Sequence, residues 1–360
     1  METFTSLEYL KIDVATNFGL DKEDWQPRIK WTDNHLSEIM DMVAQVQEGN
    51  RHPLLKQADE PALFYAGCKA LADALHGQEI SYPISKDATA SGAQLMAVLI
   101  RCEKSARLCN VVNAGFRVDY YTANYELYNK AADEALTKTR GEMKDAIMPY
   151  FYGSEAQPQK VFGKDTKEMN LFLEIMEENS PGIVVLRDAL MRCWDGDTYA
   201  HEWVMPDNFH VKIKVESVEE HEFLFKDIVD TCTRKVNAPV EKGIKNAAHV
   251  IHSTDGFVVR EMVARCDYDV NQVSKVIELL MGLEINRAGE SGQGAAIRTK
   301  SKNARMVQTL VDRYKDSGFL SVRILDYIDE DSIHLVPREP LAELVKSLPD
   351  QPFSILTVHD

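Results

Sequence analysis

Residues 86–99, KDATASGAQLMAVL, contain the junction that decides how this chain folds. Asp87 follows the alternating apolar and polar residues of ISYPIS at 80–85, a pattern typical of a strand. The Ser-Gly pair at 91–92 then opens an apolar run that predicts a helix. A strand-to-helix junction presents its side chains at the end of a sheet, where ligands are commonly bound. We therefore treat Asp87 as a candidate site residue and look for its partners.

The composition indicates a globular chain with an acidic surface. Its 360 residues are 44% hydrophobic, enough to bury a large core in two or three subdomains. The net charge of −16 argues against a general nucleic-acid binder, so a polyanion must bind at local basic patches. Six cysteines without C-x-x-C or zinc spacing predict reduced thiols. With no secretory signal or membrane-length apolar run, we expect a soluble cytosolic enzyme or interaction protein.

The spacing of apolar residues predicts a mixed α and β chain. The expected helices lie at 34–78 (with a break at 58–61), from about 91, at 119–148, 270–284 and 303–317. The expected β segments are a strand at 79–86, a strand or hairpin at 201–216, a strand before the turn and helix of 248–263, and a β-rich run at 352–360. The Gly-rich basic segment 288–305 predicts a mobile loop.

Arg140, Lys144, Met148 and Tyr152 recur at steps of four residues. On a helix this spacing places Arg140 and Lys144 on nearly one face, with Tyr152 further along. Two cations at that spacing can hold a triphosphate, and a tyrosine at the end can lie against a sugar. The alternative is a solvated basic stripe ending in a core tyrosine, which is the usual arrangement for a helix considered alone.

Two further sets of residues are candidates. Asp87 and Asp360 each end a predicted strand, and two carboxylates brought together can hold two divalent metals about 4 Å apart for phosphoryl transfer. For each acid alone, a surface or capping aspartate is the alternative. The segment HSTDG with Arg260 (residues 252–260) is the other set, and its alternative is a turn with an Asx hydrogen bond.

The order of these motifs resembles the single-subunit DNA-directed RNA polymerases of bacteriophages and mitochondria. The chain contains D-x-[ST]-x-S-G-x-Q, R-x3-K-x3-M-x3-Y-G, H-x-x-D-G-x3-R and a terminal H-D, in that order. Further similar segments are LKIDVATNFGLDK, RIKW, ADEP, YELYNKA and WVMPDNFHV. The resemblance covers roughly residues 9–267 and the last ten.

The resemblance implies a mixed α+β fold of the right-hand polymerase type, with an antiparallel palm sheet and helical fingers. The thumb and the N-terminal domain would be lacking. The predicted division is palm with the first metal motif at 1–115, fingers with the nucleotide-binding helix at 116–251, a palm return at 252–267, an insertion at 268–350, and a palm strand with the second metal aspartate at 351–360.

The resemblance also implies the site residues of DNA-templated RNA synthesis. Asp87 and Asp360, with the backbone carbonyl of Ala88, would carry two Mg²⁺ ions, which prefer oxygen ligands. The phosphates of the ribonucleoside triphosphate would be held by Lys11, Arg140 and Lys144. Tyr152 would sense the ribose, with Tyr128 nearby. His252 would lie near the incoming nucleotide or the end of the RNA–DNA hybrid.

Three positions depart from the family pattern. Leu95 stands where the family usually has histidine. Pro149 lies inside the predicted helix, where it lacks an N–H donor and is expected to kink the helix before Tyr152. Asp360 follows Asp255 by 105 residues, whereas the family runs almost directly between these motifs, so 268–350 is interpreted as an insertion.

The ends of the resemblance imply a partner. It begins in mid-palm and stops at Asp360, as in the larger subunit of the heterodimeric bacteriophage RNA polymerases. A second subunit would then supply the thumb and the N-terminal half. The other expected partners are template DNA, the RNA–DNA hybrid, nucleoside triphosphates and an accessory factor for promoter opening, with no membrane. The expected location is the cytoplasm of an infected bacterial host.

Two other functions remain open. A DNA polymerase of the related repair-type family would share the R-x3-K and Y-G elements, but it normally has a glutamate soon after the first metal aspartate. Ser91 and Gly92 stand there instead, which favours RNA synthesis. A non-catalytic scaffold with the same fold is the second alternative. The joint retention of the metal aspartates, Lys144 and Tyr152 argues against a scaffold.

Overall fold

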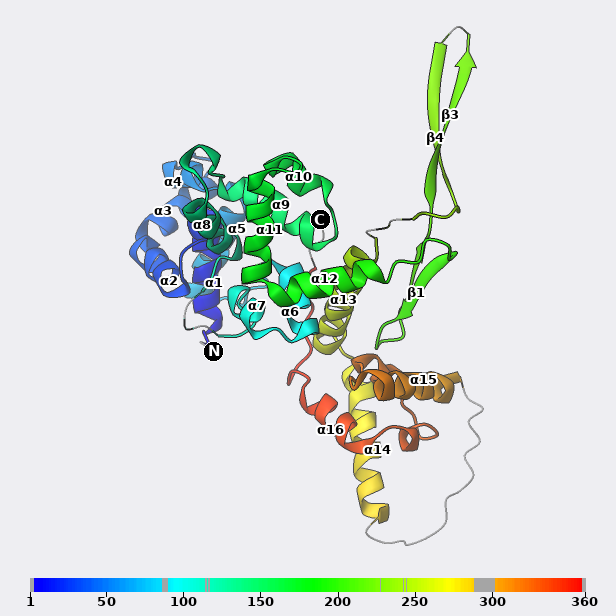
Figure 1. Ribbon diagram of the computed structural model, residues 1–360. Helices are drawn as coiled ribbons and strands as arrows, with labels where there is room; N and C mark the ends of the chain where they lie inside the picture. Colours follow the sequence, from blue (N-terminus) through cyan, green and yellow to red (C-terminus); the bar gives the residue numbers. More distant parts are fainter. Residues whose placement is uncertain are drawn as a thin grey trace. The chain divides into compact units, whose positions relative to one another are not determined.

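A computed structural model of the chain describes residues 3–85, 90–113, 115, 117–226, 228–241, 243, 245–287 and 302–357 (Figure 1). The chain forms two compact units, one from Met1–Thr89 with Asn113–Arg117 and the other from Ala90–Val112 with Val118–Asp360. Among the described residues, no helix is both long enough and apolar enough to cross a membrane. Each unit is built around cores of its own.

The first unit is helical. Its elements are α1 (Ser6–Ala15), a short π-helical turn η1 (Thr16–Leu20), α2 (Trp25–Asn34), α3 (Leu36–Gln47), α4 (Pro53–Gln57) and α5 (Pro61–Leu75). Thr5 and Glu8 form a capping box at the start of α1, and prolines occupy the first position of both α4 and α5. The core contains Leu10, Val14, Ile39, Met42 and Phe64. The helices expected at 34–78, with their break before Pro61, are confirmed.

The strand expected at 79–86 is wrong over the residues that the structure describes. Residues 79–85 have no strand pairing. Pro83 cannot donate to a ladder, and Asp13 holds this segment through its side chain instead. The hydroxyl of Tyr82 donates to Asp13 Oδ2 at 2.8 Å and the amide of Ser85 donates to Asp13 Oδ1 at 3.0 Å. Asp13 therefore ties this segment to α1 without strand pairing.

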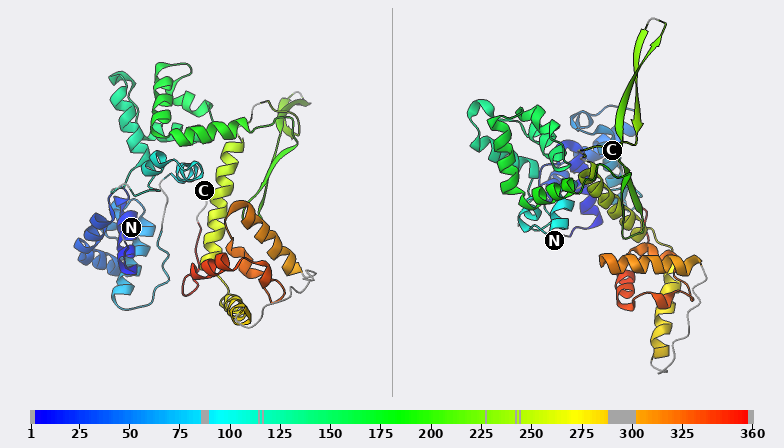
Figure 2. Two further views of the ribbon diagram at one scale, coloured as in Figure 1. Left: turned by 60° about the horizontal axis from the view of Figure 1, so that its bottom comes forward. Right: turned by 45° about the vertical axis from the view of Figure 1, so that its right-hand side comes forward.

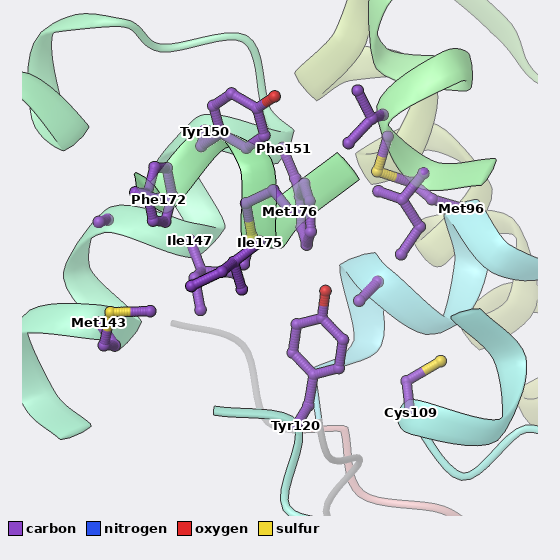
Figure 3. Packing of buried hydrophobic residues seen from close by; sticks show 14 of the residues in the cluster. Met96, Cys109, Tyr120, Met143, Ile147, Tyr150, Phe151, Phe172, Ile175 and Met176 are labelled. Atoms are coloured by element: carbon purple, nitrogen blue, oxygen red, sulfur yellow. The ribbon is translucent and has the colours of Figure 1, made fainter. Parts of the chain in front are cut away.

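The second unit opens with a helical layer. Its elements are α6 (Ser91–Ile100), α7 (Glu103–Leu108), α8 (Tyr120–Ala131), η2 (Glu134–Leu136), α9 (Arg140–Phe151), α10 (Ala156–Phe162), α11 (Lys167–Asn179) and α12 (Pro181–Arg192). Figure 3 shows Met143, Ile147 and Phe151 of α9 packing with Phe172 and Met176 of α11. These apolar faces fix how α9 is turned, and α9 continues through Pro149 to its end.

Two antiparallel hairpins follow. β1 (Ala200–Val204) pairs with β2 (His210–Lys214), and β3 (Ser217–Phe225) pairs with β4 (Ile228–Val236). The first pair confirms the hairpin expected at 201–216. The second is a long ribbon with both faces exposed (Figure 2). The mixed α+β class is confirmed, but the described strands form two separate two-stranded sheets and no larger palm sheet.

The segment 248–263 is one continuous helix, which corrects the expected strand, turn and helix. α13 (Lys245–Cys266) runs through the HSTDG motif without interruption. Gly256 is accommodated inside the helix, and the hydroxyls of Ser253 and Thr254 donate back to the carbonyl of Val250. This segment contains no proline, so the helical hydrogen-bond ladder can continue.

The C-terminal part of the second unit has a core of its own. It comprises α14 (Val270–Arg287), α15 (Lys302–Ser317), the short turns η3 (Val322–Asp326) and η4 (Ile333–Leu335), and α16 (Arg338–Lys346). Val276, Val307, Leu310, Ile324 and Leu341 are buried in it. The helices expected at 270–284 and 303–317 are confirmed. Most of the predicted mobile loop, residues 288–301, lies outside the described residues.

The β-rich run expected at 352–360 is wrong where it is described. Residues 352–357 form no strand. The amide of Phe353 donates to the carbonyl of Cys266 at 2.7 Å, which ties this segment to the end of α13. Residues 358–360 lie outside the described part of the chain.

Candidate functional site

Helix α9 carries the predicted R-x3-K pair on its outer side. Thr139 caps the helix and forms a reciprocal capping box with Glu142. Met143 and Ile147 are fully buried, which turns the face with Arg140 and Lys144 away from the core. Lys144 is exposed, and Arg140 is partly exposed. The periodic spacing in the sequence therefore does produce one cationic face.

The guanidinium of Arg140 is held by the first turn of α8. It donates from Nη2 to Asp119 Oδ2 at 2.7 Å and from Nε to Thr122 Oγ1 at 3.1 Å. Asp119 also caps α8, because its Oδ1 accepts from the amides of Tyr121 and Thr122. Burial acts to raise the pKa of Asp119, but the amide of Thr122 and the Arg140 side chain outweigh it and hold that pKa below its ordinary value.

Tyr121 is a member of this cluster that the sequence analysis did not single out. The guanidinium carbon of Arg140 lies 5.6 Å from the centroid of its ring, and Nζ of Lys144 lies 5.8 Å from it. Both distances are within the range of cation–π attraction. No sequence motif marks Tyr121, because the contact depends on how α8 and α9 pack.

Tyr152 caps the C-terminal end of α9, and its amide donates to the carbonyl of Met148 at 3.2 Å. Its phenol oxygen lies against Gly92 of α6, in the space that a Cβ atom on Gly92 would occupy. Its ring meets the ring of His252 edge-on, with centroids 5.2 Å apart. Burial, with Asp255 nearby, raises the pKa of Tyr152. Three motifs distant in sequence therefore meet at this tyrosine.

His252 lies on an exposed side of α13. His249, one turn earlier, is also exposed, and the centroids of the two rings are 6.4 Å apart. Burial and the neighbouring His252 lower the pKa of His249. Imidazoles with this exposure can donate hydrogen bonds to an anionic ligand beside Tyr152.

Arg260, the last residue of the third motif, pairs with Asp207 of the WVMPDNFHV segment. Arg260 Nε donates to Asp207 Oδ2 at 2.6 Å, and its guanidinium lies 4.2 Å from the ring centroid of Phe209. Asp207 is almost fully buried. Its carbonyl accepts from Nη1 of Arg323 at 2.9 Å. This ion pair fixes α13 to the loop between β1 and β2, and Arg323 joins the segment 268–350 to the same loop.

Tyr128 is a packing residue in the core of the second unit. It is completely buried in the core of the second unit, and its ring centroid lies 5.2 Å from that of Phe162. Its hydroxyl has no hydrogen-bond partner among the described residues. Tyr128 therefore packs between α8 and α10, and its contact with a nucleotide stays a prediction.

The remaining predicted residues are not assembled by the structure. Lys11 belongs to the first unit, where its Nζ pairs with Asp33 Oδ1 at 2.6 Å. Asp87, Ala88 and Asp360 lie outside the described residues. Within the described ranges, no group of three or more His, Cys, Asp or Glu side chains is placed to hold a metal ion. Asp13, which the sequence analysis did not single out, anchors Ser85 just before Asp87.

Comparison with known proteins finds a similarity in the N-terminal part of the chain. Residues 3–158 match the family described as DNA-dependent RNA polymerase. The match covers 156 of the 360 residues, less than half of the chain. The mitochondrial DNA-directed RNA polymerase of Schizosaccharomyces pombe is 29% identical over 164 residues, which are 41% of this chain and 14% of that protein. The mitochondrial enzyme of Neurospora crassa is 30% identical over 166 residues, covering 41% and 12%.

Plant enzymes are similar over a shorter stretch of the chain. DNA-directed RNA polymerase 1 of Arabidopsis thaliana mitochondria is 34% identical over 125 residues, which are 33% of this chain and 13% of the relative. The alignments thus span a small part of each relative's length. Lys11, Asp87, Arg140, Lys144 and Tyr152 fall within the matched residues, whereas His252 and Asp360 lie beyond them.

Proposed function

We propose that this chain takes part in DNA-templated RNA synthesis by nucleotidyl transfer. The observation that carries the proposal is the convergence of α6, α9 and α13 at Tyr152, beside the cationic face of α9. Arg140 and Lys144 supply positive charge for a triphosphate, and Tyr152 with His252 supplies polar groups one or two turns away. Residues 3–158, which match the RNA polymerase family, include Arg140, Lys144 and Tyr152.

The phosphates of the incoming nucleotide bind to Arg140 and Lys144 in this proposal. The guanidinium of Arg140 is already oriented by Asp119 and Thr122, whereas Lys144 supplies a compact point charge. Lys11 would add a third cation. Such positioning contributes most of the catalysis in phosphoryl transfer, because the transition state spreads charge over the phosphate oxygens.

Tyr152 is proposed to contact the ribose, and His252 to contact the nucleotide or the end of the RNA. Their rings touch, so a change in one displaces the other. The buried environment of the Tyr152 phenol keeps it protonated at neutral pH, since burial raises its pKa. A neutral phenol can donate a hydrogen bond to a sugar hydroxyl.

Two Mg²⁺ ions are proposed at Asp87 and Asp360, with the carbonyl of Ala88. This donor set fits Mg²⁺, because the ion is bound through one or two carboxylates together with substrate phosphates. When bound, the ions would activate the attacking hydroxyl and neutralise the leaving pyrophosphate. The hydrogen bonds from Tyr82 and Ser85 to Asp13 restrain the chain that leads to Asp87.

The partners follow from the proposed activity. Template DNA and the RNA–DNA hybrid would bind at local basic groups, because the chain as a whole carries a net charge of −16. A second subunit, as in the heterodimeric phage RNA polymerases, and an accessory factor for promoter opening are proposed as well. Co-purification of the chain from its natural source tests for both.

Substitution of the metal aspartates tests the proposed function. Asp87→Asn or Asp360→Asn keeps the shape of the side chain and removes a charge, so nucleotide addition should fall by at least about a hundredfold. Asp133→Asn, at an exposed position before η2, is the matched control. The assay is extension of an RNA primer on a DNA template by the complete polymerase. If either variant extends the primer at a rate within about tenfold of the wild type, the assignment of Asp87 and Asp360 as metal ligands is refuted.

A further inference from the structure

One aromatic ring lies beside both cations of α9. Tyr121 is near the start of α8 and is partly buried. The guanidinium of Arg140 and the ammonium of Lys144 lie 5.6 Å and 5.8 Å from its ring centroid. The two cations are four residues apart on one helix, so the ring connects them to the neighbouring helix.

The start of α8 is itself rigidly built. Asp119 accepts from the amides of Tyr121 and Thr122, at 3.0 and 3.1 Å, and also pairs with Arg140. The contacts of Arg140 with Asp119, Thr122 and Tyr121 all come from this first turn. Any shift of α8 would therefore move the guanidinium, and the ring of Tyr121 moves with the same turn.

The ring of Tyr121 restricts the position of the Lys144 ammonium more than that of Arg140, which Asp119 and Thr122 also hold. Like charges four residues apart on a helix repel each other, and a free lysine side chain samples many rotamers. The negative face of an aromatic ring offsets the repulsion and restricts the ammonium to one region. Restricting a binding group before the ligand arrives reduces the entropy lost on binding.

We propose that Tyr121 is a positioning residue that preorganises Arg140 and Lys144 for the triphosphate of the incoming nucleotide. The inference rests on the proposed function, since it assumes that the two cations bind phosphates. Tyr121 acts through them and does not touch the substrate. The chemistry required at position 121 is thus an aromatic face, not a hydroxyl.

The hydroxyl of Tyr121 has no charge to contribute. Burial, followed by the neighbouring Tyr152, raises the pKa of Tyr121 to about 12. The phenol stays neutral at any pH used for RNA synthesis. Phenylalanine keeps the ring that faces the cations, whereas leucine keeps apolar volume without a quadrupole.

The experiment compares Tyr121→Leu with Tyr121→Phe in the complete polymerase. Steady-state extension at saturating primer–template gives KM and kcat for each nucleoside triphosphate. Tyr121→Leu should raise KM about fivefold to thirtyfold, the range expected from two exposed cation–π contacts, with little change in kcat. Tyr121→Phe should stay within about twofold of the wild type, because the ring remains.

Tyr125→Leu is the matched control. Tyr125 lies one turn further along α8 and packs against the hydrophobic core. The same substitution there should lower thermal stability without raising KM selectively. An equal rise in KM for Tyr125→Leu and Tyr121→Leu would mean that loss of packing in α8 explains both, and the proposal would be overturned.

Lys144→Ala separates failure of this inference from failure of the proposed function. If Lys144→Ala leaves KM unchanged, the cationic face does not bind the triphosphate and both proposals fall. If Lys144→Ala raises KM but Tyr121→Leu does not, only the role of Tyr121 is refuted. A rise in KM for Tyr121→Phe as large as for Tyr121→Leu would assign the effect to the hydroxyl and also overturn the inference.

Discussion

The phenol oxygen of Tyr152 occupies the space beside Gly92 that any larger residue at position 92 would need. This contact joins the end of α9 to the start of α6. Gly92 belongs to the Ser-Gly pair that follows Asp87 in the sequence, and Tyr152 ends the helix that carries the two cations. The glycine is therefore required by the packing of the tyrosine.

Gly92→Ala should damage the site and lower stability. The added methyl group would collide with the phenol and with the side chain of Met148, a form of overpacking that costs about 1–3 kcal/mol. We expect a lower urea midpoint and slower nucleotide addition. Gly141→Ala in α9 is the control, because its methyl group would meet only Thr139 Oγ1 at 3.9 Å. Equal midpoints for the two variants would contradict the contact.

Tyr152→Phe should weaken discrimination between ribose and deoxyribose. The substitution keeps the ring against His252 and Gly92 but deletes the oxygen available to a sugar hydroxyl. The ratio of kcat/KM for ATP to that for dATP should fall by at least about tenfold, with ATP used at nearly the normal rate. An unchanged ratio in primer extension would leave Tyr152 as a packing residue only.

The sequence was sufficient where a pattern is local. The four-residue steps from Arg140 to Tyr152 correctly predict one helix with both cations on one face, because helical periodicity depends only on spacing. The hairpin at 201–216 and the helices expected at 34–78 follow from the same kind of local pattern. The contact of Tyr152 with His252 was not predicted, because spacing alone does not relate residues on different helices. The family resemblance implied only that each residue would lie near the nucleotide.

The sequence was insufficient where a tertiary contact decides. Residues 79–85 alternate as a strand does, but the buried carboxylate of Asp13 binds Tyr82 and Ser85 and takes the place of a ladder. The family resemblance implied that Tyr128 lies near the nucleotide, and packing against neighbouring helices buries its side chain completely. Tyr121 carries no motif at all. Each of these outcomes depends on a neighbour more than five residues away, which local periodicity does not contain.

Asp13→Ala should destabilise the first unit and impair nucleotide addition. The variant would leave the partly buried Ser85 amide and Tyr82 hydroxyl without their acceptor, which costs about 0.5–1.5 kcal/mol per hydrogen bond. It would also release the segment that leads to Asp87. Asp73→Ala in α5 is the control, because Asp73 forms a surface pair with Lys69 that is worth less than about 1 kcal/mol. Similar losses in both variants by urea unfolding would refute the anchoring role.

Glu261 joins α13 to the segment 268–350, and its titration should be measurable. Its carboxylate accepts from the hydroxyl of Ser321 and, at 3.1 Å, from the amide of Val322. Burial, only partly offset by these hydrogen bonds and by Arg265, raises the pKa of Glu261. The folded chain therefore binds this proton more tightly than the unfolded chain does.

The raised pKa fixes the sign of the pH dependence. The stabilisation linked to the Glu261 proton is fully present below the ordinary glutamate pKa of 4.5, and it is lost as pH rises through the higher pKa of the folded state. Glu261→Gln cannot titrate. The unfolding free energy of the wild type relative to Glu261→Gln should therefore be highest in acid and fall as pH rises from about 4.5, by at most about 1.4 kcal/mol per pH unit.

Urea unfolding at a series of pH values gives this difference, and Glu343→Gln, at an exposed position on α16, controls for the loss of one charge. A difference independent of pH would show that Glu261 titrates alike in the folded and unfolded chain, and the buried link between α13 and Ser321 would be refuted.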